Sequence, residues 1–338
     1  MGFIPNKGAG LFKPLAVLIP LTMSLAIVSC ANQPAPNDRQ KVARKTKIKN
    51  LPESNASDDK MDLDSHSWMA KLPDSISLVS LNIPGTHNSG ALHEPFPRTA
   101  KCQQLSIIDQ LKIGVRFLDI RCRHVKDRFF IYHGPINQRL SFEAVLGSIY
   151  SFLESNQSET LIISIKEENS ATQTTRPFTE TLHWYIDKNP DKWLLKEAVP
   201  NLQEARGKIA LLRRFRSSIP FGIPATNWGH DGFFVGSNLF VQDKFKIPDN
   251  GTKWKIMQKA FEHSLKDSSS RLHLHFGSGY TQNRLGIPNI TAISDPINKK
   301  LSKYLKKAPK QRHGCVVLDF INPDLAEAIY NLNFPAKN

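Results

Sequence analysis

The 338-residue sequence predicts an α/β fold and, within that class, a distorted (β/α)8 barrel of the TIM type. Strand-like runs recur along the chain, and helix-length intervals with apolar spacing separate most of them. The sequence lacks the glycine-rich phosphate fingerprint of dinucleotide-binding sheets. One pair of runs is joined too tightly for a helical crossover, and this pair is the departure from regular barrel alternation.

The expected strands are short runs rich in β-branched and aromatic residues. They are Ser77–Ile83, Val115–Arg121, Arg128–His133, Thr160–Lys166, Lys208–Arg214, Asn238–Asp243, Leu272–Phe276 and Cys315–Phe320. The expected helices carry apolar residues at three- and four-residue spacings. They are Gln103–Leu111, Phe142–Leu153, Thr179–Trp193, Lys253–Leu265, Pro296–Leu305 and Asp324–Tyr330. Together they predict one globular domain over residues 68–338.

Residues 1–29 resemble a bacterial lipoprotein signal peptide. Two lysines precede an apolar run from Leu15 to Val28, and Cys30 follows the run closely. In such signals the chain is cut before the cysteine, which is then acylated, so Cys30 is the predicted lipidation site. The alternative is an ordinary secretory signal in which Cys30 is incidental. We therefore expect an exported protein, either secreted or lipid-anchored to the bacterial cell envelope, with the outer membrane as one destination.

Residues 30–67 are expected to form a flexible, basic and polar tether, because they contain too few large apolar residues to offset the entropy cost of ordering. The basic cluster Arg39–Lys49 would either lie near anionic headgroups or serve as a solvated spacer. The formal net charge of +15 suggests a polyanionic partner, but charge alone does not distinguish a membrane surface from nucleic acid.

Three further cysteines, Cys102, Cys122 and Cys315, allow at most one disulfide, and none of their spacings is typical of a metal site. The sequence leaves open whether any disulfide forms among them. We interpret all three as structural.

The runs Val115–Arg121 and Arg128–His133 are joined by a short polar bridge, which predicts an antiparallel hairpin. A hairpin centred near Lys126 would place Asp119 opposite His133. Such a pairing would bring an acid and an imidazole onto one face of the ladder.

Arg121 would share that face with Asp119, because side chains alternate along a strand. The hairpin therefore predicts a cluster of an acid, a guanidinium and an imidazole. The alternative is a surface hairpin with ordinary solvated charges.

Charged and imidazole side chains also gather at the carboxyl ends of the other expected strands, where barrels of this type carry their chemistry. They are His87, Lys166, Arg213, Arg214, Asp243 and Asp319. Converging on one rim, they would form a strongly cationic pocket containing a few carboxylates. Such a pocket suits a phosphate ester that bears a hydroxyl-rich group.

Seven ordered stretches resemble the bacterial phosphatidylinositol-specific phospholipase C family, the X-domain barrel, over roughly residues 70–335. They read IPGTHNSGA, GVRFLDIRCR, FIYHGP, LIISIKEE, ARGKIALLRRF, VQDKF and VVLDFIN. The resemblance implies a phosphorus–oxygen lyase that cleaves phosphatidylinositol, with GPI anchors as a further substrate class. Its expected products are diacylglycerol and inositol 1,2-cyclic phosphate.

The resemblance also implies roles for individual residues. His87 would be the general base that takes the proton of the inositol 2-hydroxyl, and His133 the general acid that protonates the departing diacylglycerol oxygen. Arg121 would contact the phosphoryl oxygens. Asp319 would orient the base, and Asp119 would complete the network around Arg121.

Four further positions match residues that hold the inositol group in this family. Lys166, Arg214 and Asp243 would grip its hydroxyls, and Arg214 is preferred to its neighbour Arg213 because alternation gives only one of the two to the lumen. Phe245 stands where family members carry a tyrosine that stacks under the ring. Phenylalanine keeps the stacking face and loses the hydroxyl.

No cofactor and no metal are expected. Related calcium-dependent enzymes place an acidic ligand where this chain has Arg121, whose fixed charge disfavours a hard cation. Asn88 is a departure, because the metal-independent bacterial members carry an aspartate there that is thought to assist the acid. Asn88 therefore puts in question either the catalytic rate or the expectation that no metal is needed.

Two other groups leave alternatives open. Trp228, Phe233 and Phe234 would either form a lipid-facing aromatic loop or pack internally. His273 and His275 share a strand face, which suggests a metal pair, but no third ligand is evident in the sequence.

The competing functions are a catalytically weak or inactive barrel that binds inositol lipids or glycans, and a metal-dependent enzyme of the glycerophosphodiesterase kind. The expected partner is phosphatidylinositol in an anionic membrane surface. We expect a monomer and no nucleic-acid partner, since no supporting motif accompanies the basic charge.

Overall fold

The computed structural model describes residues 63–334. The predicted signal peptide, Cys30 and most of the predicted tether lie outside the described residues. The last tether residues, 63–67, are described and contact the folded domain, because Arg116 donates hydrogen bonds to the carbonyls of Ser65 and His66. Within the described range, the structure contains no helix with the length and apolar character needed to cross a bilayer.

Parallel strands form the wall of a barrel, in the order β7–β5–β2–β1–β14–β11–β10. Their bounds are β1 Ile83–Thr86, β2 Phe117–Val125, β5 Leu161–Thr172, β7 Ile209–Arg214, β10 Leu239–Asp243, β11 Leu272–Phe276 and β14 Cys315–Leu318. In the region described, the ladder is open, because the short strands next to β7 on one side and next to β10 on the other do not pair with each other. The predicted distorted barrel of the α/β class is therefore confirmed.

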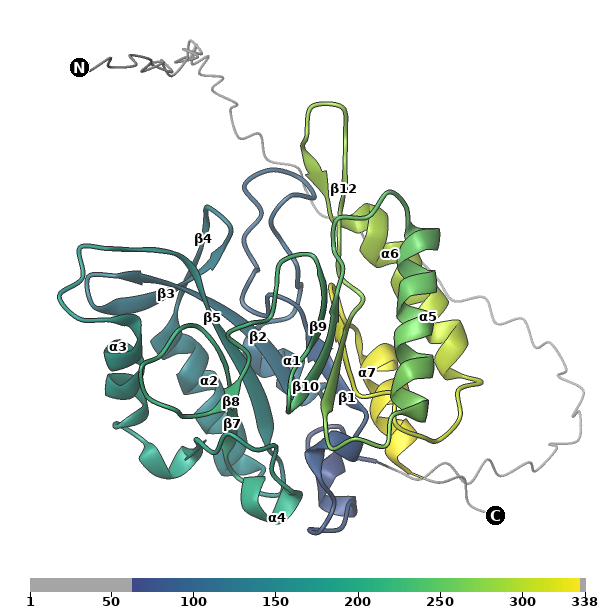
Figure 1. The fold of residues 1–338 in the computed structure, drawn as a ribbon, viewed down its shortest axis with the longest axis horizontal. Helices are drawn as coiled ribbons and strands as arrows, with labels where there is room; N and C mark the ends of the chain where they lie inside the picture. Colours follow the sequence, from purple (N-terminus) through teal and green to yellow (C-terminus); the bar gives the residue numbers. More distant parts are fainter. Residues whose placement is uncertain (1–62, 335–338) are drawn as a thin grey trace, which may run out of the picture. The chain divides into compact units, whose positions relative to one another are not determined.

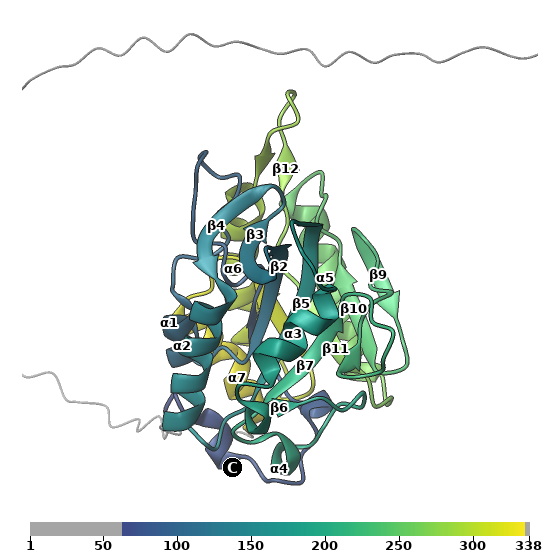
Figure 2. The same ribbon diagram turned by 90° about the vertical axis from the view of Figure 1, so that its left-hand side faces the viewer.

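Some shorter strands pair with the wall or with the hairpin that continues it, and two others form a separate sheet. They are β3 Arg128–His133, β4 Ile136–Ser141, β6 Trp193–Leu194, β8 Ile223–Pro224, β9 Gly232–Val235, β12 Thr281–Gln282 and β13 Pro288–Asn289. β6 and β8 pair with β7, and β9 pairs antiparallel with β10. The β12–β13 hairpin projects beyond the rest of the domain in both views (Figures 1 and 2).

Helices cover the outside of the wall, with α2 and α3 on one side and α5, α6 and α7 on the other (Figure 1). The α-helices are α1 Ile107–Lys112, α2 Phe142–Ser155, α3 Phe178–Ile186, α4 Leu202–Ala205, α5 Asn250–Lys266, α6 Thr291–Leu305 and α7 Pro323–Tyr330. The 3-10 helices are η1 Trp68–Lys71, η2 Leu78–Ser80, η3 Pro190–Lys192 and η4 Asn331–Asn333.

Alternation along the wall strands divides their side chains between two cores. On β2, Leu118 and Ile120 pack in the layer under the helices, whereas Phe117 packs inside the barrel. Aliphatic residues of the other wall strands, such as Ile162 and Val317, join Phe117 in the lumen. The lumen is therefore closed by apolar side chains below the strand ends, and polar side chains are left to its mouth.

The first predicted strand, Ser77–Ile83, is wrong for most of its length. The Ser77 side chain accepts a hydrogen bond from the amide of Val79 and caps η2, and β1 begins only at Ile83. β1 contains Gly85, where a Cβ atom would lie 3.1–3.2 Å from Phe117 and Val317. Proline and glycine are uncommon in strands, so the sequence of β1 does not look like a strand. The glycine is needed because Phe117 and Val317 pack closely against it.

The predicted helix Thr179–Trp193 ends early. α3 stops at Ile186, and Trp193 belongs to β6. Pro190 begins η3 after Asn189, whose φ of −146° is not helical. A residue that precedes proline is disfavoured in the helical region, and this explains the break.

The antiparallel hairpin of β2 and β3 is confirmed, but its predicted register is wrong by one residue. The ladder runs from Cys122↔Ile131 to Val125↔Arg128, so it is centred between Lys126 and Asp127. Both of these residues have positive φ, 50° and 55°, as a two-residue type I′ turn requires.

In this register Asp119 does not pair with His133. The recorded pairing of β2 with β3 ends at Ile131, and His133 lies beyond it. His133 reaches the barrel mouth because β3 has left the ladder with β2 by that point.

Candidate active site

A cavity of about 630 Å³ opens at the carboxyl ends of the wall strands. Its wall contains most of the side chains that the sequence singled out. These are His87, Arg121, His133, Lys166, Arg214, Asp243, Phe245 and Asp319. Asn88 and Asp119 are fully buried and lie outside the cavity lining.

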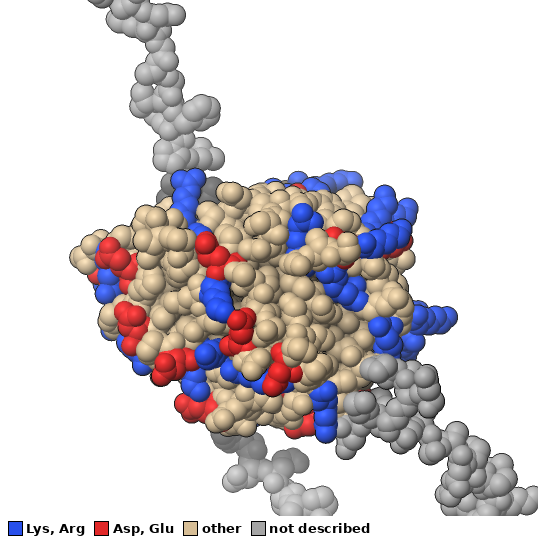
Figure 3. Space-filling model, turned by 60° about the horizontal axis from the view of Figure 1, so that its bottom comes forward, with Lys and Arg blue, Asp and Glu red and all other residues tan. Residues whose placement is uncertain are grey.

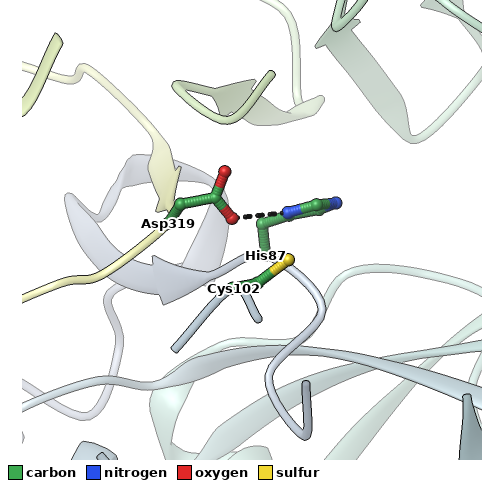
Figure 4. Close-up of side chains that lie close together, drawn as sticks. All are labelled: His87, Cys102 and Asp319. Atoms are coloured by element: carbon green, nitrogen blue, oxygen red, sulfur yellow. Dashed lines mark hydrogen bonds and ion pairs between the residues drawn. The ribbon is translucent and has the colours of Figure 1, made fainter. Parts of the chain in front are cut away.

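His87 and Asp319 follow the neighbouring strands β1 and β14 and meet at the cavity (Figure 4). The distance from His87 Nδ1 to Asp319 Oδ1 is 2.7 Å. Because an ionised carboxylate can only accept, Nδ1 carries the proton and Nε2 is left as a proton acceptor. Gln103 Nε2 donates to the carbonyls of His87 and Leu318, which fixes the two strand ends relative to each other.

His133 borders the cavity beside His87. The two ring centroids are 6.3 Å apart and the rings lie edge to face. His133 Nδ1 donates to the Ala100 carbonyl at 2.7 Å, so Nε2 is the nitrogen free to exchange a proton with a ligand. Burial lowers the pKa of His133 below its ordinary value, and the positive charge of Arg121 lowers it further.

Arg121 is held by two carboxylates. Its Nε and Nη2 atoms both lie 3.0 Å from Asp119 Oδ2, and Nη1 lies 3.6 Å from Glu168 Oε1. Burial alone would raise the pKa of Asp119, but Arg121 and Arg214 hold it well below the usual range. Asp119 is therefore an ionised counter-ion beneath the cavity, and it fixes the guanidinium in place.

The backbone N–H of Asn88 also donates to Asp119, at 3.1 Å. The residue has a φ of +43° and is fully buried. Both polar atoms of its side-chain amide lack a hydrogen-bond partner among the described residues. In this structure Asn88 therefore contacts the site through its backbone.

The cavity wall away from the histidines carries paired charges. Lys166 Nζ donates to Glu168 Oε2 at 2.5 Å, and Arg214 Nη2 lies 3.4 Å from Asp243 Oδ2. Burial favours the neutral acid, but Arg121 and Lys166 lower the pKa of Glu168 to about 2. This wall therefore offers charged donors and acceptors side by side, as hydrogen bonding to vicinal hydroxyls requires.

Aromatic rings complete this end of the cavity. Phe245 lies 4.9 Å from His230 and 5.9 Å from Tyr280, measured between ring centroids. The Arg214 guanidinium lies 3.6 Å from the centre of the Trp228 ring, and Trp228 Nε1 donates to Asp243. Trp228 thus packs internally and positions two polar residues.

The other members of the suggested aromatic loop differ. Phe234 packs against the luminal core, whereas Phe233 is 55% exposed on β9. β9 pairs antiparallel with β10, and Phe233 lies opposite Gln242, next to the carboxyl end of that strand.

Alternation separates Arg213 from Arg214. Arg213 points out of the lumen and donates to the carbonyls of Phe221 and Phe215, whereas Arg214 lines the cavity. Glu168, which sequence reasoning missed, lies two residues after Lys166, so the same alternation could have found it. His230 and Tyr280 come from loops, where no periodicity marks which side chains face a cavity.

The three cysteines of the described region are free and buried. Cys122 and Cys315 pack in the two hydrophobic cores. Cys102 lies near the active-site histidines, with Sγ 3.7 Å from His133 Nδ1. His273 and His275 are buried on the outer face of β11, where both contact the Ser264 hydroxyl.

Comparison with known proteins identifies related sequences and folds. Residues 81–215 match the family model described as "Phosphatidylinositol-specific phospholipase C, X domain". A 1-phosphatidylinositol phosphodiesterase of Staphylococcus aureus is 30% identical over 277 residues, covering 75% of this chain and 88% of that protein. A protein of the same name from Listeria monocytogenes is 33% identical over 211 residues, 60% of this chain and 65% of the relative.

A solved structure supports the same relationship. The crystal structure of a phosphatidylinositol-specific phospholipase C from Staphylococcus aureus matches with a TM-score of 0.73 and 26% identity. The match covers 80% of this chain and 98% of that one. The similarity therefore extends over almost the whole length of the solved chain.

Proposed function

Because this chain belongs to the phosphatidylinositol-specific phospholipase C family, we propose that it cleaves phosphatidylinositol to diacylglycerol and inositol 1,2-cyclic phosphate. GPI anchors, which carry the same phosphoinositol group, are a second substrate class. The observation that carries the proposal is the pair of histidines at one cavity, with Asp319 orienting His87 and Arg121 on the same wall.

The reaction begins at His87. Nε2 removes the proton of the inositol 2-hydroxyl, and the oxygen attacks the phosphorus of the same molecule. The new P–O bond closes a five-membered ring while the bond from phosphorus to the diacylglycerol oxygen breaks. Because nucleophile and phosphorus belong to one substrate, the enzyme needs only to hold them in line. Asp319 stabilises the imidazolium that forms on His87.

His133 completes the transfer by protonating the departing diacylglycerol oxygen through Nε2. Arg121 offsets the negative charge that builds on the non-bridging oxygens. Its guanidinium is held by Asp119 and Glu168 before substrate arrives, so little reorganisation is needed during reaction. Slow hydrolysis of the cyclic product follows if water enters and the two histidines exchange roles.

The polar wall of the cavity supports recognition of the inositol ring. Lys166, Arg214, Asp243 and Glu168 provide donors and acceptors for its hydroxyls. Phe245 supplies an apolar face for stacking. Tyr280 borders the same cavity, so a phenol hydroxyl remains in the wall although position 245 lacks one.

Metal independence is part of the proposal. Asp119 is already neutralised by Arg121 and Arg214, so it is not free to bind a cation. A Ca²⁺ ion would need several oxygen ligands and would face the fixed charge of Arg121. The guanidinium supplies the positive charge at the phosphate.

The membrane surface that presents the substrate would dock at the mouth of the barrel. Exposed apolar side chains stand there, with Leu285 83%, Phe96 66% and Ile287 47% exposed. Phe96 and Ile287 also line the cavity. Leu285 and Ile287 lie between β12 and β13, in the hairpin that projects outward (Figure 2). The opposite end of the barrel, turned forward in Figure 3, carries both acidic and basic side chains.

We also propose that the protein is exported and anchored to the membrane by a lipid on Cys30. Both rest on the sequence of residues 1–30. A Cys30→Ser variant is expected to be absent from the membrane fraction of the producing cell, because residue 30 would no longer carry acyl groups.

The test of function is incubation of the purified protein with phosphatidylinositol micelles in EGTA, followed by phosphorus NMR. Cyclic inositol phosphate is expected for the native chain and for His66→Ala, an exposed-histidine control, and is expected to be absent for His87→Ala and His133→Ala. Product only after addition of Ca²⁺ would overturn metal independence. No product under either condition would favour a lipid-binding barrel without catalysis.

A further inference from the structure

Cys102 takes no part in the reaction proposed above, yet its thiol lies beside the reacting groups. A ligand atom from each of Cys102, His87 and Asp319 lies within 4.8 Å of the other two. Figure 4 shows the Cys102 sulfur near the point where the His87 ring meets the carboxylate. The segment is fixed, because the Cys102 backbone N–H donates to Ala91 and its carbonyl accepts from Phe320.

The three side chains offer sulfur, nitrogen and oxygen, which is a donor set that Zn²⁺ accepts. Around a tetrahedral Zn²⁺, such donors stand about 3.4–3.6 Å apart, so the cluster needs only sub-ångström to ångström-scale adjustment. A second observation points to a ligand. Asp319 Oδ2 is unpartnered among the described residues, although the side chain is 1% exposed. A buried carboxylate oxygen without a donor gains by binding a cation.

Charge balance favours a divalent ion here. One carboxylate and one thiolate neutralise Zn²⁺, so the buried complex carries no net charge. The nearby Arg121 is already paired with Asp119 and Glu168, which limits its repulsion of the ion. The cavity wall includes His87 and Asp319 and gives an entry path from solvent.

We propose that a thiophilic divalent cation, with Zn²⁺ as the type case, binds His87 Nδ1, Asp319 and Cys102 Sγ and inhibits the enzyme. Binding forms one metal–nitrogen, one metal–sulfur and one metal–oxygen bond, and water from the cavity takes the fourth position. The Nδ1 proton of His87 and the thiol proton of Cys102 are released to solvent. No electron is transferred.

Inhibition follows from the tautomer of His87. A neutral imidazole that binds metal through Nδ1 carries its proton on Nε2, and Nε2 is the atom that must accept the proton of the inositol hydroxyl. The metal therefore removes the base and leaves the inositol-binding wall unoccupied. It should lower kcat more than it changes KM. The expected inhibition rests on the proposed function, whereas metal binding itself does not.

Binding is measured first, with Cd²⁺ and Zn²⁺ added to the full chain. Cd²⁺ should produce the ultraviolet charge-transfer absorption of a cadmium–thiolate bond, and Cys102→Ala should lose that signal. Cys122→Ala is the matched control, because Cys122 is equally buried but packs in the hydrophobic layer between β2 and the helices. Cys30 is present in every variant, so the difference between the two spectra isolates Cys102.

A second cluster, His263, Asp267 and His273, also holds its ligand atoms within 4.8 Å. There His273 Nε2 and the Ser269 hydroxyl already bond Asp267 Oδ2, and the Ser269 backbone N–H donates to Oδ1, so both oxygens are satisfied. A His263→Gln variant removes this cluster as a competing Zn²⁺ site. It should leave the cadmium–thiolate signal unchanged.

Activity is measured next on phosphatidylinositol micelles. Zn²⁺ should inhibit the native chain and Cys122→Ala alike, and Cys102→Ala should need at least about 100-fold more Zn²⁺ for the same inhibition, because a direct ligand is lost. Without metal, Cys102→Ala should retain activity, which also shows that it folds. Ca²⁺ and Mg²⁺, which prefer oxygen ligands, should not inhibit.

Two results would overturn the inference. One is a cadmium–thiolate signal that persists in Cys102→Ala, and the other is equal Zn²⁺ inhibition of the native chain and Cys102→Ala. If the native chain has no phospholipase activity, the spectra still decide whether the site binds metal. Failure of the proposed function and failure of this inference are thus separate results.

Discussion

Arg121 is the residue on which the electrostatics of the site converge. It contacts Asp119 with two nitrogens and Glu168 with a third, so its guanidinium enters the cavity with a fixed orientation. Planar, multidentate contact of this kind is specific to arginine, since a lysine ammonium is a point charge on a flexible stem. The orientation is therefore as important as the charge.

Arg121→Lys is accordingly expected to lower kcat by about 10²–10³-fold, the usual effect of removing one preorganised donor at a transition state. KM should change little, because other cationic groups still attract the phosphate. Steady-state kinetics on phosphatidylinositol micelles tests this. Arg123→Lys, on the same strand and bonded to Thr172, is the control and should behave like the native chain. A large rise in KM at constant kcat would instead assign Arg121 to substrate binding alone.

To act as the proposed general acid, His133 has to be protonated, yet burial lowers its pKa in the free protein. The fraction of protonated His133 is lost as pH rises through that lowered pKa, so the alkaline limb of the kcat/KM profile should lie at low pH. A bound phosphodiester brings a negative charge beside the imidazolium and raises the pKa. The alkaline limb of kcat should therefore lie at higher pH than that of kcat/KM.

The measurement is a pair of pH profiles, one for each parameter, at constant ionic strength. Glu168→Gln sharpens it, because the Glu168 carboxylate raises the pKa of His133 and its removal should move the kcat/KM limb to still lower pH. Coincident limbs for kcat and kcat/KM would show that the phosphate does not couple to His133.

At the scale of elements, the β12–β13 hairpin is the part of the domain that we expect to bind lipid without taking part in the chemistry. Leu285 is 83% exposed on a hairpin that projects from the domain, and it is not among the cavity-lining residues. Burying a leucine side chain in an apolar environment contributes about 1.5–3 kcal/mol. An exposed leucine at the mouth of a lipid-cleaving barrel is therefore useful only when a bilayer covers it.

Leu285→Ser should reduce binding to phosphatidylinositol vesicles, and cleavage in them, by about 10- to 100-fold, from the same burial free energy. Cleavage of a soluble glycerophosphoinositol substrate should be unchanged. Val235→Ser is the matched control, because Val235 is 58% exposed but pairs with Phe240, toward the amino end of β10. Equal losses in the two variants, or a loss on the soluble substrate, would contradict docking through the hairpin. Vesicle sedimentation provides the binding measurement.

An element can be predicted from the sequence to the extent that its structure depends on residues close to it in the chain. The long alternating run of β2 predicts both its strand and its luminal face, so Asp119 and Arg121 are placed together by sequence alone. The register of the hairpin is a different matter, since it depends on positive φ at both Lys126 and Asp127. Aspartate is common in such turns, but lysine is not, so the pair is a weak turn signal.

The same contrast holds for the site. Lys166, Arg214, Asp243 and Asp319 lie at strand ends, where the barrel rule and alternation place them. Tyr280 and His230 lie on loops, and Cys102 approaches His133 through a segment without periodic structure. Their positions depend on tertiary packing, which no local pattern encodes.

At the scale of the whole molecule, the end of the barrel opposite the cavity is held by a buried ion pair. Arg116 and Glu159 are both fully buried, and Arg116 Nε lies 2.8 Å from Glu159 Oε2. The remaining guanidinium nitrogens donate to four backbone carbonyls, those of Leu111, Val115, Ser65 and His66. This arginine therefore joins the first described residues to β2 and to the start of β5.

Glu159→Gln should destabilise the fold without changing the chemistry. Removal of one partner leaves the buried guanidinium uncompensated, which costs about 3–5 kcal/mol. Urea unfolding should show a lower midpoint. The kcat/KM of the folded protein should stay near the native value, because the cavity lies at the other end of the barrel. Glu204→Gln, which breaks the exposed pair with Lys196, is the control and should leave the urea midpoint almost unchanged. If Glu159→Gln is as stable as the control, the buried pair does not stabilise the fold. If the folded variant loses activity, the two ends of the barrel are not independent.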